Sequence, residues 1–107
     1  MRYKLCFYVP VTHAEQVKQA VFAAGAGTIG NYDCCAWQVL GVGQFRPLAG
    51  SQAFLGQQDV LEQVAEYKVE MLCTKPYLNA AITALKQAHP YEEPAFDVVA
   101  LVDIEHL

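Results

Sequence analysis

Apolar and polar residues alternate in four segments of the chain, a pattern typical of β-strands with one buried face. The predicted strands cover residues 2–9, 36–45, 66–73 and 95–104. The third shows the pattern most clearly, with the apolar face Tyr67, Val69, Met71 and Cys73 opposite the charged residues Glu66, Lys68 and Glu70. One face of this strand is therefore expected to lie in the core.

Two segments between the strands carry apolar residues at helical spacing. The apolar faces are Val17, Ala20, Val21 and Ala24 within residues 13–24, and Leu78, Ala81, Ile82, Leu85 and Ala88 within residues 76–88. A capping box of Thr12 and Glu15 is expected to begin the first helix, and Gly25 to end it. Pro76 suits the first turn of the second helix, and Pro90 ends that helix.

The resulting order, β-α-β-β-α-β, consists of two similar halves in series. It predicts an α+β fold of the ferredoxin-like type, in which an antiparallel sheet carries both helices on one face. Residues 1–107 are expected to form one domain. Trp37, Val99 and Leu101 make the other sheet face partly apolar. Either the long connection 46–58 or a neighbouring subunit is expected to cover it.

Composition narrows the classes of partner. The 107 residues are 54% hydrophobic and 17% charged, with a net charge of −4. The seven Lys and Arg residues are scattered, whereas nucleic-acid binding needs a clustered positive face, so we expect no nucleic-acid partner. No apolar run approaches the roughly 18 residues of a membrane span, and residues 1–10 do not look like a signal peptide. We expect a cytoplasmic protein without a membrane partner, whose four cysteines stay reduced.

The segment His89-Pro90-Tyr91-Glu92-Glu93-Pro94 is the candidate ligand site, because two prolines hold its polar side chains in defined directions. Imidazole, phenol and carboxylate groups together suit a divalent metal, the only cofactor that the residues suggest. The opposing interpretation is structural: Pro90 ends a helix, His89 interacts with the helix dipole, and the glutamates are solvated.

Two further residues join this candidate site, and none of its members is assigned a catalytic role. His13 begins the first helix and Tyr32 follows a glycine-rich loop, and both could approach from a neighbouring subunit. The sequence shows no nucleophile with a matching base and no metal-ligand cluster of known spacing. The identity of a metal or other ligand stays open.

Four segments, 10–13, 24–32, 41–47 and 89–97, resemble in order the insert domain of the NIF-three-like (YqfO) family. HPYE at 89–92 also resembles CutA, a trimeric relative of the PII signalling proteins. The resemblance implies a stand-alone PII/CutA-like domain that forms a homo-oligomer, with a trimer favoured over a dimer. In the larger family the metal ligands belong to two flanking halves. Both are missing here, so the suspected hydrolase activity is not expected to carry over.

Three functions follow, in this order. The first is a non-catalytic, self-associating PII/CutA-like module that binds a small ligand, a metal ion or a partner protein. The second is a structural interaction or capping domain with no ligand of its own. The third is a metal-dependent hydrolase, for which the residues give the least support.

Overall fold

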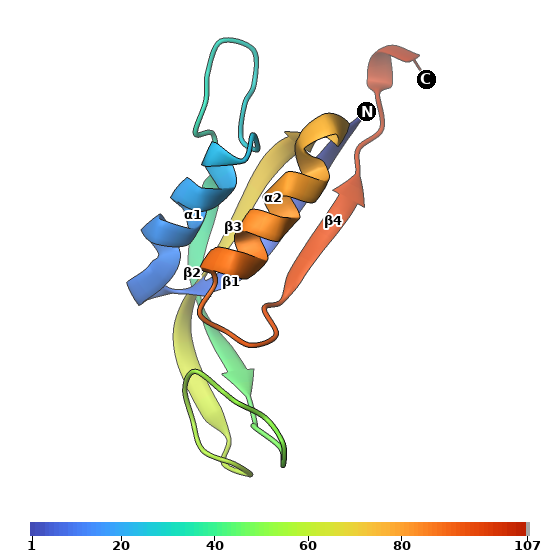
Figure 1. Cartoon of the computed structure of the whole chain (residues 1–107). Helices are drawn as coiled ribbons and strands as arrows, with labels where there is room; N and C mark the ends of the chain where they lie inside the picture. Colours follow the sequence, from blue (N-terminus) through green and yellow to red (C-terminus); the bar gives the residue numbers. More distant parts are fainter. Residues whose placement is uncertain (107) are drawn as a thin grey trace.

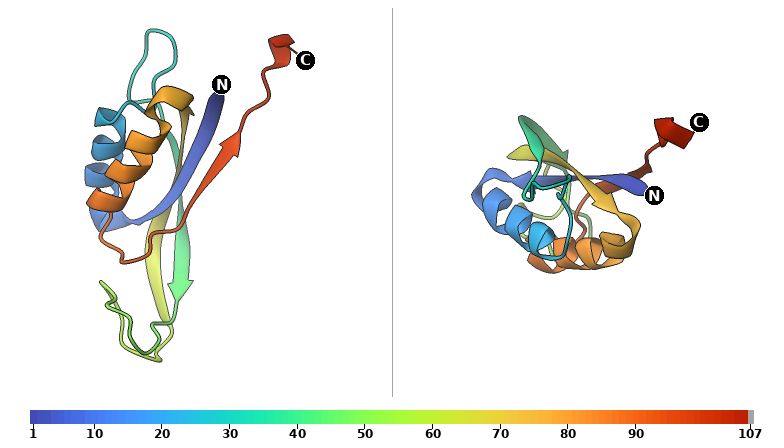
Figure 2. Two further views of the ribbon diagram at one scale, coloured as in Figure 1. Left: turned by 45° about the vertical axis from the view of Figure 1, so that its right-hand side comes forward. Right: turned by 90° about the horizontal axis from the view of Figure 1, so that it is seen from above.

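A computed structural model describes residues 1–106, and its elements follow the predicted order (Figure 1). They are β1 (Arg2–Pro10), α1 (Ala14–Ala23), β2 (Trp37–Phe45), β3 (Glu62–Thr74), α2 (Lys75–Ala88) and β4 (Phe96–Ala100), with 3-10 turns at Val11–His13 and Ile104–His106. The strands form one antiparallel sheet in the order β2-β3-β1-β4. Both helices lie on one face of it (Figure 2), which confirms the ferredoxin-like fold.

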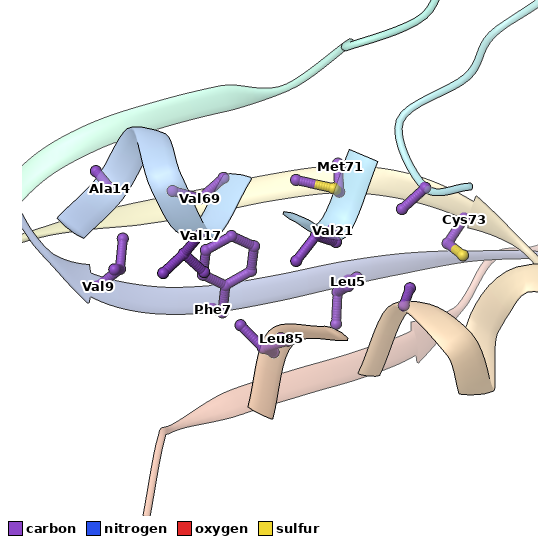
Figure 3. Close-up of a cluster of buried hydrophobic side chains, with 12 residues drawn as sticks. Leu5, Phe7, Val9, Ala14, Val17, Val21, Val69, Met71, Cys73 and Leu85 are labelled. Carbon is purple, nitrogen blue, oxygen red and sulfur yellow. The ribbon is translucent and has the colours of Figure 1, made fainter. Parts of the chain in front are cut away.

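The core lies between the two helices and the central strands β1 and β3 (Figure 3). β1 contributes Leu5, Phe7 and Val9, β3 contributes Val69, Met71 and Cys73, and the helices contribute Ala14, Val17, Val21, Ala81 and Leu85. All of these positions except Ala14 lie on the predicted inward-facing sides of their elements, because side chains alternate along a strand and recur every three or four residues along a helix. Full burial of each large member contributes about 1.5–3 kcal/mol.

Two strand boundaries differ from the prediction by more than one residue, and strand pairing explains both. β3 begins at Glu62, four residues early, because it continues to pair with β2 as far as Phe45. These two strands therefore extend beyond β1 as a two-stranded ribbon. β4 ends at Ala100 instead of residue 104, because Ala100 already pairs with Tyr3, near the start of β1. Beyond it the backbone N–H of Leu101 still donates to Arg2.

The ends of α1 confirm one prediction and contradict another. Gly25 has a φ of +114° directly after the helix, as expected of a glycine terminator. The capping box is absent: His13 occupies the N-cap position and makes no side-chain cap hydrogen bond. Thr12 Oγ1 instead bonds Nδ1 of His13 at 2.8 Å, which removes the hydroxyl from the helix end. The α-helices described within residues 1–106 have 10 and 14 residues, fewer than the roughly 18 that a membrane-spanning helix needs.

The connection between β2 and β3, residues 46–61, does not cover the sheet. It lies at the far end of the β2–β3 ribbon and turns back beside it (Figures 1 and 2). On the sheet face opposite the helices, Trp37 remains 61% exposed and Val99 54% exposed. The connection therefore leaves Trp37 and Val99 uncovered. A neighbouring subunit, the other cover expected for this sheet face, stays a prediction.

Leu85→Ala tests the core. Leu85 belongs to α2 and its side chain is fully buried against the sheet. Its truncation should therefore lower the free energy of unfolding by about 2–5 kcal/mol. Gln87→Ala is the matched control, because Gln87 is exposed on the same helix and should change stability by no more than about 0.5 kcal/mol. Urea unfolding followed by circular dichroism measures both, and equal losses would contradict the packing described.

Candidate functional site

His89 is a buried histidine whose two ring nitrogens are both in use. Its Nε2 lies 2.7 Å from the backbone oxygen of Tyr8, and its Nδ1 lies 3.1 Å from the backbone nitrogen of Tyr91. A carbonyl can only accept and a backbone N–H can only donate, so Nε2 carries the proton and Nδ1 accepts. Burial lowers the pKa of His89, although the bond to Tyr8 opposes this shift. The imidazole is therefore neutral and ties the end of α2 to β1.

Tyr91 reaches from the same segment to a buried carboxylate on β3. Its hydroxyl donates to Oε2 of Glu66 at 2.7 Å, and Glu66 is only 9% exposed. Burial, together with this carboxylate, raises the pKa of the Tyr91 hydroxyl, which keeps it protonated as a donor. The carboxyl group of Glu66 lies directly against Gly43 of β2, where any side chain carbon would overlap it.

An aromatic cluster forms around Tyr91. The ring of Phe45 lies 5.8 Å from that of Tyr91, and the ring of Phe54 lies 6.3 Å from it. Phe54 also meets His13 edge-on at 5.2 Å. The backbone N–H of Gln52 donates to Oε1 of Glu92 at 3.2 Å. These contacts join the connection 46–61 to residues 89–94, which are far apart in the sequence.

A cavity of about 650 Å³ lies between the ribbon, this connection and residues 89–94. The aromatic residues Phe45, Phe54 and Tyr91 line it together with apolar groups of β2. Three carboxylates, those of Glu66, Glu92 and Glu93, line it as well. Its volume is within the range of small-molecule sites, which are usually concave, mostly apolar and equipped with a few polar groups. The arrangement can hold a ligand, and among the described residues that line the cavity no nucleophile is paired with a base.

The structure brings most of the predicted site residues together. Tyr91, Glu92 and Glu93 line the cavity, and His89 lies behind Tyr91 with ring centroids 4.9 Å apart. His13 lies near the cavity through Phe54. Tyr32 is 75% exposed in the connection between α1 and β2, which Figure 1 shows at the opposite end of the molecule. Its participation from a neighbouring subunit stays a prediction.

A divalent metal at this segment stays a prediction, and in the observed arrangement His89 has no free ring nitrogen for it. Ligation by His89 would break its bond to Tyr8 or to Tyr91, because a metal needs a free ring nitrogen. Within residues 1–106, no group of three or more His, Cys, Asp and Glu side chains is placed to hold a metal ion. For His89 the geometry supports the structural interpretation of the segment.

Among the cavity residues that were not predicted, Glu66, Phe54 and Phe45 make the main contacts with Tyr91 or its ring cluster. Phe45 is the last residue of a predicted strand, and Glu66 is one of the polar residues that alternate with the apolar face of its strand. Glycine inside a strand can indicate a bulge or a close approach, and β2 contains Gly41 and Gly43. The group that approaches Gly43 is the Glu66 side chain.

Gly43→Ala and Gly41→Ala form a matched pair on β2. An added methyl group at Gly43 would displace the Glu66 carboxyl group and break its bond with Tyr91, whereas at Gly41 it would meet no atom within 4 Å. We expect Gly43→Ala to lose about 1–3 kcal/mol of unfolding free energy, the cost of an unsatisfied buried group. Gly41→Ala should stay within about 0.5 kcal/mol. Urea unfolding that gives both variants the same stability would contradict this contact.

Stability should fall on mild acidification because of His89. The unfolded chain protonates this histidine near its ordinary pKa of 6.5, while the folded chain resists protonation until a lower pH. The folded state thus binds fewer protons, and its stability decreases as pH falls below about 6.5. Urea unfolding at pH 7.5 and 5.5 measures the loss, which His89→Gln should reduce.

His13→Gln is the control for this pH dependence. It removes a histidine that is only half-buried and leaves His89 in place, so the loss of stability between the two pH values should persist. An undiminished loss in His89→Gln would show that another group is responsible.

Comparison with known proteins relates nearly the whole chain to part of longer proteins. Over 101 residues, 94% of its length, the chain is 45% identical to the GTP cyclohydrolase 1 type 2 homolog of Halalkalibacterium halodurans. The match covers 27% of that relative, so the chain spans about a quarter of the length of the curated relatives it matches. No family model matches the chain.

Solved structures give the same result. A Bacillus cereus protein related to NIF3 superposes with a TM-score of 0.81 at 40% identity, covering 95% of this chain and 26% of that one. CutA from Xylella fastidiosa superposes with a TM-score of 0.68 at 22% identity, covering 98% of this chain and 88% of that one, which shows a common fold. The predicted resemblance is confirmed: the chain is related, over nearly its whole length, to one segment of NIF3-related proteins, and it has the fold of CutA.

Proposed function

We propose that this chain is a non-catalytic, self-associating module that assembles through β2 and the uncovered sheet face, and that binds a ligand in the cavity. The main observation in support of self-association is that apolar side chains are exposed on both faces of β2. Trp37 and Val39 are 61% and 44% exposed on one face, and Leu40 and Val42 are 60% and 73% exposed on the other.

The position of β2 strengthens this proposal. Within residues 1–106 it pairs only with β3, so its outer backbone edge has no partner strand in the described part of the chain. Edge strands that stay monomeric are usually protected by lysine, proline, a bulge or a short length. β2 is nine residues long, WQVLGVGQF, and has neither lysine nor proline. A second copy that pairs with this edge would bury both the backbone groups and the apolar side chains.

The uncovered sheet face supports the same assembly. Val99 and Trp37 lie on it at opposite edges of the sheet, and the connection 46–61 leaves them open. A neighbouring subunit is the remaining cover among those expected. The common fold with CutA adds support for the oligomer, for which we propose a trimer ahead of a dimer.

We also propose that the chain has no hydrolase activity of its own. The relatives named GTP cyclohydrolase 1 type 2 homolog are about four times longer than the matched segment. Within residues 1–106 the cavity offers carboxylates and a tyrosine hydroxyl, without a cysteine, serine–histidine pair or metal-ligand group beside them. A capping domain without any ligand is the alternative, and occupancy of the cavity distinguishes the two.

Light scattering coupled to size exclusion tests the assembly. At micromolar concentration we expect the chain to have a multiple of its 11.8 kDa mass, and the double variant Trp37→Lys, Val39→Lys to have the monomer mass. Leu48→Lys is the control, because Leu48 is equally exposed in the connection 46–61 and lies outside β2. It should keep the wild-type mass.

Circular dichroism must show that the double variant is folded. A wild-type chain that is monomeric at this concentration would contradict the proposal. A folded double variant with unchanged mass would contradict the choice of β2 as the contact.

A further inference from the structure

The cavity combines an apolar interior with one deeply placed carboxylate. Glu66 is 9% exposed, and its Oε2 accepts the bond from Tyr91. No donor within residues 1–106 bonds its other oxygen, Oε1. Among the described residues, no side-chain oxygen or nitrogen sealed from solvent lacks a partner, so Oε1 keeps some access to solvent. Glu66 lines the cavity, and Oε1 lies against Gly43, which lines it too. A buried carboxylate oxygen with an unused acceptor is suited to a donor group on a ligand.

The charges around the cavity favour a cation. Three carboxylates line it, those of Glu66, Glu92 and Glu93, against the single ammonium group of Lys68. Lys68 already lies 3.8 Å from Glu70, which offsets part of its charge. The lining is therefore negative, and a concave negative site attracts cations and repels anions.

The aromatic rings favour an organic cation over a metal ion. Phe45 and Phe54 flank Tyr91, with ring centroids 5.8 and 6.3 Å from it. Ammonium groups are attracted to the faces of aromatic rings, and an apolar body attached to them gains from burial against the same rings. A small metal ion would instead require several oxygen or nitrogen ligands around one point, which this lining does not provide.

We propose that the cavity binds a small organic ammonium ion with an apolar body, whose cationic group contacts Oε1 of Glu66 and whose body lies among Phe45, Phe54 and Tyr91. The proposal specifies the ligand class in the binding part of the proposed function, and it does not depend on self-association. Tyr91 positions the carboxylate, and Gly43 leaves it room.

Three probes of equal ring and linker test the charge requirement: phenethylamine, 2-phenylethanol and 3-phenylpropanoate. NMR titration at pH 7 should give saturable shifts of the Phe54 and Tyr91 signals with the amine. The alcohol should bind about tenfold more weakly, because it lacks the charge-assisted hydrogen bond. The propanoate should bind more weakly still.

Glu66→Gln tests the carboxylate that is proposed to bind the cationic group. Glutamine keeps an oxygen to accept from Tyr91 and removes the charge, so the affinity for phenethylamine should fall about tenfold while that for 2-phenylethanol stays the same. Asp97→Asn is the control, because it removes one negative charge from an exposed position of the same sheet outside the cavity lining. It should change neither affinity by more than about twofold, as screened surface charges act weakly at a distance.

If the Glu66→Gln variant does not fold, Phe54→Leu gives a second test of the proposed cation site. Phe54 is 46% exposed in the connection, so its loss should leave the sheet folded and weaken phenethylamine binding. Equal binding of amine and alcohol, or full affinity in a folded Glu66→Gln, would overturn the cation class while leaving a binding cavity. If none of the three probes binds at millimolar concentration, both the cation class and ligand binding in the cavity are overturned. The light-scattering test of assembly is independent of this result.

Discussion

The imidazole of His89 joins the end of α2, the backbone of β1 and the start of the segment that leads to β4. It donates to the carbonyl of Tyr8 and accepts from the backbone of Tyr91, so only one neutral tautomer satisfies both partners. This bond pair places Tyr91 where its hydroxyl meets Glu66. The position of the buried carboxylate in the cavity thus depends on a histidine that does not itself line the cavity.

The cavity exists because the sheet narrows at the same level. Pro10 is the last residue of β1 and pairs with Glu66, and beyond it β2 and β3 continue as a ribbon. Proline lacks the backbone N–H that a further ladder bond would need, which favours the end of β1 at this point. The connection 46–61 and residues 89–94 then enclose the space beside the ribbon and hold each other through Phe54, Tyr91 and Glu92.

The elements of this fold could be predicted from the sequence because their signals are local. Alternation placed Leu5 and Val69 in the core, and Gly25 marked the end of α1. The cavity could not be derived in the same way, since Glu66 and Tyr91 are 25 residues apart and no periodicity relates them. The residues 89–94 were recognised as stiff and polar, yet only the structure separates the positioning role of His89 from the residues that line the cavity.

The proposed assembly and the proposed ligand binding both involve β2, and this has a thermodynamic consequence. Val39 and Val42 line the cavity and are also among the exposed apolar residues of the edge strand. A ligand that changes the conformation or exposure of these side chains changes the free energy of contact between copies. Linkage makes the effect reciprocal, so that assembly alters ligand affinity by the same factor. Because the shared residues belong to one continuous strand, such coupling needs no movement of the helices or of the core.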